Sequence, residues 1–170
     1  ISRAQESPVG HEYMALASVF HLTNMQRARG ALSFVINACQ QTLDWAATHG
    51  AQTSFGAGML LIQLADLLRA HNELATALHH ATTGIALSHQ GAYPSLFLVG
   101  SLVLVRIKQA LGDREGIFDI VQQMRQMATN FYQADWLVGL LPAVEAHLRL
   151  TQGDFAAALQ WAQQADGAEP

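Results

Sequence analysis

Cysteine, proline and charge are all scarce in this chain, and each shortage excludes a class of protein. The single cysteine, Cys39, excludes an internal disulfide framework and fits a reducing cytosol. Four prolines, together with little alternation of Val, Ile and Thr, argue against sheets. Only 13% of the residues are charged and the net charge is −4 at pH 7. The composition therefore does not indicate binding to nucleic acid or to an anionic membrane surface.

Long apolar runs are missing as well. The longest run, from Leu96 to Val105, contains Gly100 and Ser101 and is about half the length that a bilayer requires. The opening "ISRAQESPVG" is polar and turn-rich, unlike a signal peptide. Because the chain begins with Ile1 and ends on "DGAEP", we expect a fragment of a longer, cytoplasmic protein.

The sequence also lacks the motifs of common enzyme and metal sites. The stretch "SFGAGML" around Gly56 and Gly58 has no Lys-Ser/Thr for a phosphate-binding loop. None of the eight histidines are paired four residues apart, and "HEYMA" at His11 lacks the second histidine of a zinc protease. No serine lies in a nucleophile elbow. We therefore expect that the chain is not an enzyme and holds no metal or cofactor.

What the chain does have is a repeat. Its turn residues, separated by 42, 40 and 41 positions, are Gly30, Asn72, Gly112 and Gly153. Small residues recur seven positions before each turn, at Thr23, Ala65, Val105 and Ala146, and nine positions after it, at Cys39, Ala81, Val121 and Ala162. The apolar positions on both sides follow helical spacing. The pattern predicts an all-α fold in which residues 1–170 form one domain, an α-solenoid of about four antiparallel helix pairs.

The same register assigns packing roles to several residues. Cys39 and Ala77 fall in close-contact columns, so we expect both to be buried between helices. Trp45 and Trp161 lie on second helices and are also interpreted as packing residues. An aromatic column near the start of the first helices, interpreted as packing between units, consists of Tyr13, Phe55 and Trp136.

A polar strip runs along the first helix of each pair. Positions nine, six and three before the turn share one helix face, and their polar occupants are His21, Asn24, Arg27, Gln63, Asp66, Arg69, Arg106, Gln109 and His147. One interpretation is a solvated face; the other is that the strip lines a concave groove that binds a ligand or partner. Arg106 and Asp66 stand at the same distance from their turns in neighbouring units, so they are the predicted charge pair.

Three phrases resemble a known family: "DLLRAHNELATALHHATTGIAL", "LVLVRIKQALGDREGIFDIV" and "AHLRLTQGDFAAALQWAQQADG". They are similar to the tetratricopeptide-like (TPR-like) repeats of MalT-like, large ATP-dependent LuxR-type bacterial transcriptional regulators. That family favours an Ala-Arg pair before Gly-Asp and a Trp after an Ala-rich stretch. The counterparts here are Val105-Arg106, Gly112-Asp113 and Trp161. The resemblance covers essentially the whole chain.

The resemblance implies a role in signal sensing. In the family, an ATP-binding switch module precedes the repeats and a helix-turn-helix follows them, while the repeats sense an inducer and relay its presence to oligomerisation and DNA binding. The partners implied are thus a small-molecule inducer or a protein or peptide, and a second copy through the exposed solenoid ends. Few aromatic residues lie on the predicted groove face, which argues against a sugar. The alternative is a generic TPR-type protein-interaction scaffold unrelated to transcription.

Overall fold

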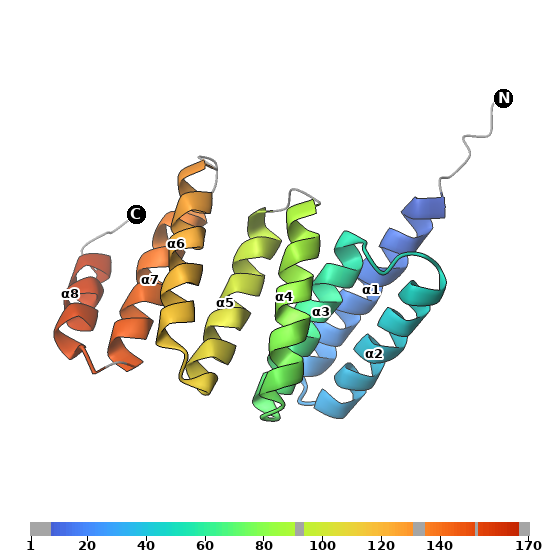
Figure 1. The fold of residues 1–170 in the computed structure, drawn as a ribbon, viewed down its shortest axis with the longest axis horizontal. Coiled ribbons are helices and arrows are strands. Elements are labelled where there is room, and N and C mark those ends of the chain that lie inside the picture. The colour runs from blue at the N-terminus through green and yellow to red at the C-terminus, as the bar shows by residue number, and fades with distance from the viewer. Residues whose placement is uncertain (1–7, 91–93, 131–134, 152, 167–170) are drawn as a thin grey trace. The chain divides into compact units, whose positions relative to one another are not determined.

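Helices account for the fold. The computed structural model describes residues 8–90, 94–130, 135–151 and 153–166, and within these ranges there is no strand. The helices are α1 Pro8–Ala28, α2 Leu32–Thr48, α3 Phe55–Ala70, α4 Leu74–Gln90, α5 Pro94–Leu111, α6 Arg114–Asn130, α7 Asp135–Thr151 and α8 Phe155–Asp166. Consecutive helices run antiparallel from α1 to α5, and again from α6 to α8 (Figure 1). The predicted all-α repeat fold is confirmed. No helix in these ranges is long and apolar enough to cross a membrane.

The four turns within the helix pairs share one backbone conformation. Gly30, Asn72, Gly112 and Gly153 have φ angles of 79°, 64°, 74° and 84°. In each turn the next residue's N–H donates to the carbonyl five positions before it, as from Asp113 to Lys108 at 3.0 Å. This left-handed closure of a helix is available to glycine and, at low cost, to asparagine. The turn positions predicted from the repeat are therefore confirmed.

The chain divides into two compact units, residues 1–114 and 115–170. In the first unit the first helices α1, α3 and α5 contact each other in a row, and α2 and α4 pack against that row. Helix α3 lies at the centre, because it contacts α1, α2, α4 and α5. Most of α3 from Gly56 to Leu68 is consequently buried, including its polar residues Gln63 and Asp66.

Two glycines let α4 and α5 approach α3 closely. A Cβ atom at Gly84 of α4 would lie 2.8 Å from Cγ1 of Ile62 and 2.9 Å from the carbonyl oxygen of Gly58. A Cβ at Gly100 of α5 would lie 2.8 Å from Cδ1 of the same isoleucine. Because interiors are close-packed, Ile62 fills the space that these two missing side chains leave.

The small columns are buried as expected except at Ala162, which is half-buried. The residues seven before each turn are at most 6% exposed, and Cys39, Ala77 and Ala81 are fully buried. The interpretation of Trp45 as a packing residue was wrong in part. Its side chain is 37% exposed and stacks on His49, with 4.4 Å between the ring centroids. Phe55 begins α3 and is half-buried, whereas the side chains of Tyr13 and Trp136 lie outside the described residues.

The second unit contains α6, α7 and α8. Ile117, Ile120 and Met124 of α6 are buried, as are Ala146 and Leu148 of α7. An ion pair links these two helices, since Arg125 lies 2.6 Å from the Glu145 carboxylate. Helix α8 packs against α7. The pair α7–α8 therefore matches the helix pairs of the first unit.

Candidate ligand-binding site

The polar side chains predicted on the first helices form a hydrogen-bonded group between α1 and α3. The Thr23 hydroxyl donates to the side-chain oxygen of Gln63 at 2.8 Å, and the Gln63 amide nitrogen donates to the side-chain oxygen of Asn24 at 3.0 Å. The Cys39 thiol of α2 lies 3.8 Å from the same Gln63 oxygen. Gln63 is 4% exposed, so these bonds satisfy a buried amide that would otherwise be costly.

One helical turn further along α3, a buried carboxylate meets three arginines. Asp66 pairs with Arg27 of α1, with Nε and Nη2 of Arg69 at 3.1 and 3.0 Å, and with Nη1 of Arg106 of α5 at 3.9 Å. Burial by itself raises the pKa of Asp66, but the charges and hydrogen bonds of Arg27 and Arg69 outweigh it and lower the pKa below its ordinary value. The carboxylate is therefore ionised at neutral pH.

We call Thr23, Asn24, Arg27, Gln63, Asp66, Arg69 and Arg106 the polar cluster. The predicted pairing of Arg106 with Asp66 is confirmed, although Arg27 and Arg69 are the closer partners. The sequence signal for those two was their shared column, three residues before the turn. The interpretation of the strip as only a solvated face does not hold at Gln63 and Asp66, which are 4% and 3% exposed.

The other predicted residues lie outside the cluster. His21 is exposed on α1, where its ring meets the ring of Phe20 edge-on at a centroid distance of 5.7 Å. Gln109 is half-buried on α5, one turn beyond Arg106. His147 is exposed on α7 and belongs to the second unit. Within the described ranges, no three His, Cys, Asp or Glu side chains are close enough to hold a metal ion.

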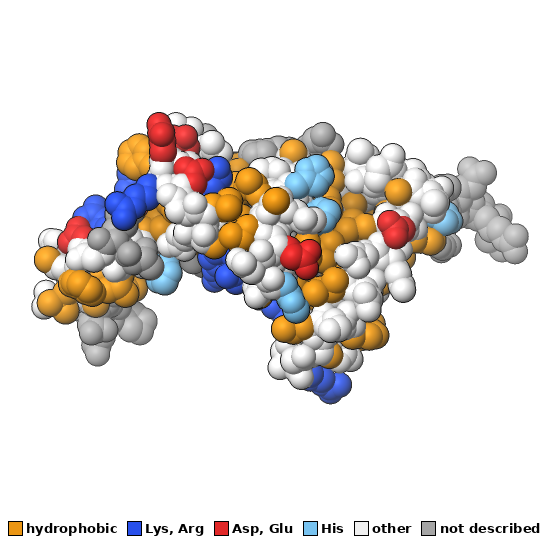
Figure 2. All heavy atoms as spheres, turned by 60° about the horizontal axis from the view of Figure 1, so that its bottom comes forward, with side chains coloured by type: hydrophobic (Ala, Val, Ile, Leu, Met, Phe, Trp, Pro, Cys, Tyr) orange, Lys and Arg blue, Asp and Glu red, His pale blue; other side chains and the backbone are white. Residues whose placement is uncertain are grey.

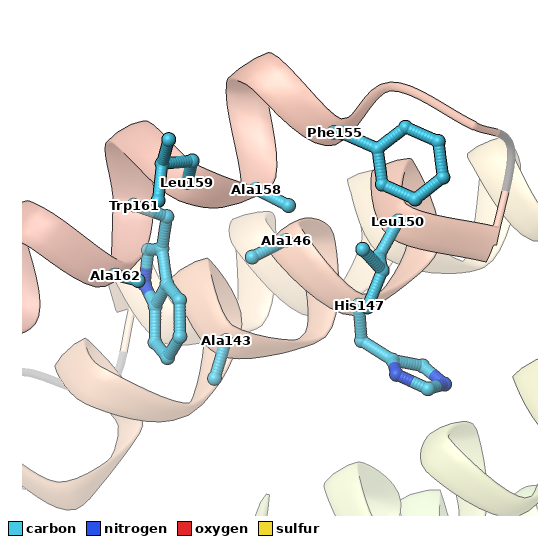
Figure 3. A pocket seen from close by; sticks show the side chains of 9 residues that line it. All are labelled: Ala143, Ala146, His147, Leu150, Phe155, Ala158, Leu159, Trp161 and Ala162. Atoms are coloured by element: carbon cyan, nitrogen blue, oxygen red, sulfur yellow. The ribbon is translucent and has the colours of Figure 1, made fainter.

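A second candidate feature, which the motif search missed, is an apolar hollow of about 570 Å³ between α7 and α8. It is lined by Ala143, Ala146, His147, Leu150, Phe155, Ala158, Leu159, Trp161 and Ala162. Figure 3 shows Trp161 and His147 toward opposite sides of the hollow, with alanines between them. Trp161 is half-buried, and Phe155 and Leu159 are 68% and 60% exposed. Exposed hydrophobic side chains are also frequent elsewhere on the surface (Figure 2).

The repeat register explains what kind of surface this hollow is. Each residue that lines the hollow lies at a fixed distance along the sequence from the turn residue Gly153. The residues at the same distances from the turn residue Gly30, in the first helix pair, are Phe20, Thr23, Asn24, Arg27, Leu32, Val35, Ile36, Ala38 and Cys39. Four of these residues are joined to Gln63 or Asp66 of α3, and five are packed in the core cluster that includes Leu60 and Leu64 of α3. The hollow therefore occupies the positions at which α1 and α2 receive a neighbouring helix.

Tandem antiparallel helix pairs of about 40 residues, closed by the same left-handed turn, define the chain as a TPR-like α-helical repeat protein. The sequence profile of the MalT-like TPR region matches residues 2–170, so the chain belongs to that family. The family suggested by the residues is thereby confirmed. Neither the curated proteins nor the solved structures gave a match to the chain.

Proposed function

We propose that this chain is the effector-sensing repeat region of a MalT-type transcriptional regulator, and that the polar cluster is where the effector acts. The observation that carries the proposal is the position of Asp66, whose carboxylate interacts with arginines of α1, α3 and α5. These are the first helices of three consecutive pairs. A ligand that binds these arginines would change how the pairs pack on one another, and so relay its presence along the repeats.

The rest of the regulator is part of the proposal. An ATP-binding switch module and a DNA-binding helix-turn-helix would flank the repeats in the same polypeptide, in the cytoplasm. The repeats would not contact DNA themselves, in keeping with their net charge of −4. Effector binding at the polar cluster would favour the oligomer that binds the promoter.

Arg106→Ala in the parent regulator tests this proposal. Arg106 is 53% exposed and its distance to Asp66 is too long for a hydrogen bond, so its loss should leave the melting temperature nearly unchanged. We expect effector-dependent transcription from a reporter to be abolished. Arg149→Ala, at an exposed position of α7, is the matched control and should retain induction. Normal induction with Arg106→Ala, or a much lower melting temperature, would contradict the proposal.

The hollow between α7 and α8 favours a second candidate function, a protein-interaction scaffold. The polar residues Thr23 and Arg27 of the α1–α2 surface are replaced here by Ala146 and Leu150, so the fitting partner is a helix with an apolar stripe. A fluorescent Leu/Ala-striped helical peptide should bind the chain, and Ala158→Glu should abolish binding because it places a charge in an apolar groove. A peptide with glutamates in its stripe is the control. Equal binding to wild type and Ala158→Glu would contradict this function.

A further inference from the structure

The charges in the polar cluster do not balance. Three guanidinium groups, from Arg27, Arg69 and Arg106, surround the single carboxylate of Asp66. Among the described residues no second carboxylate is paired with any of the three. Arginine stays protonated in proteins, and the lowered pKa of Asp66 keeps it ionised. Three positive charges and one negative charge leave an excess of two positive charges at this place.

We propose that the three arginines bind a small molecule with two negative charges on its oxygen atoms, either a phosphate monoester or a dicarboxylate. The proposal names the chemical class of ligand for the effector site proposed above, and rests on it in assigning the ligand a regulatory role. The excess of two positive charges matches the charge of such a group. Asp66 serves as the fixed internal counterion, and the ligand completes the neutralisation from the solvent side.

The guanidinium groups have donors left for such a ligand. Each carries five N–H donors in a planar fork that suits carboxylate and phosphate oxygens. Arg69 directs Nε and Nη2 toward Asp66, and Arg27 directs Nη2 there. Arg106 stands 3.9 Å from the carboxylate, beyond hydrogen-bond distance. Its own N–H groups are therefore not used by Asp66.

Exposure places those donors at the surface. The side chains of Arg27, Arg69 and Arg106 are 41%, 30% and 53% exposed, whereas that of Asp66 is 4% exposed. The buried carboxylate thus anchors Arg27 and Arg69 by hydrogen bonds and attracts Arg106 by its charge, while all three side chains remain partly exposed to solvent. Holding the arginines in advance lowers the conformational cost of binding.

Stability alone does not account for three arginines at one carboxylate. Partly exposed ion pairs contribute little, and like charges gathered at one place repel each other. A single arginine with two hydrogen bonds would satisfy Asp66. A dianion on the solvent side would attract all three guanidinium groups and offset their mutual repulsion, which is the physical basis for binding.

Direct titration of the 170-residue chain tests the site. The probes are inorganic phosphate and succinate at pH 7.5, each compared with acetate and chloride at equal ionic strength, and the readout is the Nε–Hε resonances of the arginines. We expect phosphate, succinate or both to shift the resonances of Arg27, Arg69 and Arg106 saturably, while Arg149 stays unchanged. The probe that binds more tightly identifies the ligand group as a phosphate or a dicarboxylate.

Two variants sharpen the test. Arg106→Gln should weaken binding of the better probe by about tenfold or more, because charge-assisted hydrogen bonds are lost. Arg149→Gln removes the same charge from the second unit and should bind as wild type does. Shifts of equal size at all arginines, no preference over acetate and chloride, or wild-type affinity in Arg106→Gln would overturn the site.

The outcomes separate this inference from the proposed function. If the dianions fail to bind while Arg106→Ala still abolishes induction in the parent regulator, the ligand class is wrong and the effector site stands. If the dianions bind through Arg106 but induction survives Arg106→Ala, the anion site stands and its regulatory role is wrong.

Discussion

Arg27 of α1 and Asp66 of α3 form an ion pair across the boundary between the first two helix pairs. The carboxylate is 4% exposed and the arginine 41% exposed, so the pair bridges the core and the solvent. Arg69 and Arg106 meet the same carboxylate. Asp66 is consequently an electrostatic link between α1, α3 and α5.

Replacing Asp66 by asparagine should destabilise the chain. Asp66→Asn keeps the size of the side chain but removes its charge, and three guanidinium groups lose their common counterion. We expect the free energy of unfolding at pH 7 to fall by about 1.5–3 kcal/mol, the range for hydrogen bonds to charged groups. Urea denaturation gives the value, and Asp119→Asn, at an exposed position of α6, should change it by less than about 0.5 kcal/mol.

The difference in free energy of unfolding between wild type and Asp66→Asn should also depend on pH, which is a separate prediction. The folded-state pKa of Asp66 is depressed below its ordinary value of 3.8, so its contribution to stability is present above pH 3.8 and is lost as the pH falls through the folded-state pKa. The difference between wild type and Asp66→Asn should therefore stay constant from pH 7 to about 5 and narrow below pH 3.8. A difference that narrows at higher pH would show that Asp66 is not held ionised by its arginines.

Cys39 should weaken the fold at alkaline pH. Burial raises the pKa of its thiol from 9.0 to about 11, with an opposing hydrogen bond from Thr23. Between these values the unfolded chain releases the proton while the folded chain keeps it, so stability falls as the pH rises from 9 to 11. Cys39→Ala should remove this contribution to the decrease of the free energy of unfolding with pH, as measured by urea denaturation at several pH values. Identical slopes would mean that the thiol titrates normally.

Gly84→Ala should show how closely α4 approaches α3. Its Cβ would lie within 2.9 Å of both the Ile62 side chain and the Gly58 carbonyl oxygen. Because the backbone carbonyl cannot move aside easily, we expect a loss of about 1–3 kcal/mol despite the higher helix propensity of alanine. Thr76→Ala, at an exposed position of the same helix, should cost less than about 0.5 kcal/mol. A more stable Gly84→Ala would argue against this close approach.

Ala77→Leu tests the repeat register. Ala77 is fully buried, so three more carbon atoms should overpack the core and lower the free energy of unfolding by about 1–3 kcal/mol. Ala86→Leu, on the exposed face of α4, should change it by less than about 0.5 kcal/mol. Thermal and urea denaturation of the two variants gives the comparison, and equal losses would show that the columns are misaligned.

The helix pairs and their turns could be predicted because their causes are local. Glycine or asparagine is needed where φ is positive, and Gly30, Asn72, Gly112 and Gly153 mark those places in the sequence. Helical spacing likewise shows which positions share a face. Asp66 and Arg106 lie at the same distance before the turns of neighbouring helix pairs, so their pairing could be predicted.

The environment of these side chains was decided by the tertiary structure alone. Asp66 is buried because α3 lies among four other helices, and Arg27 reaches it from a position 39 residues earlier in the chain. Trp45 is partly exposed on α2, although its place on a second helix was interpreted as a packing position. Desolvation and the balance of charge depend on neighbours from other repeats, which the periodicity of a single helix does not specify. The sequence determined which residues share each helix face, and the packing of the helices determined which of them meet and which face solvent.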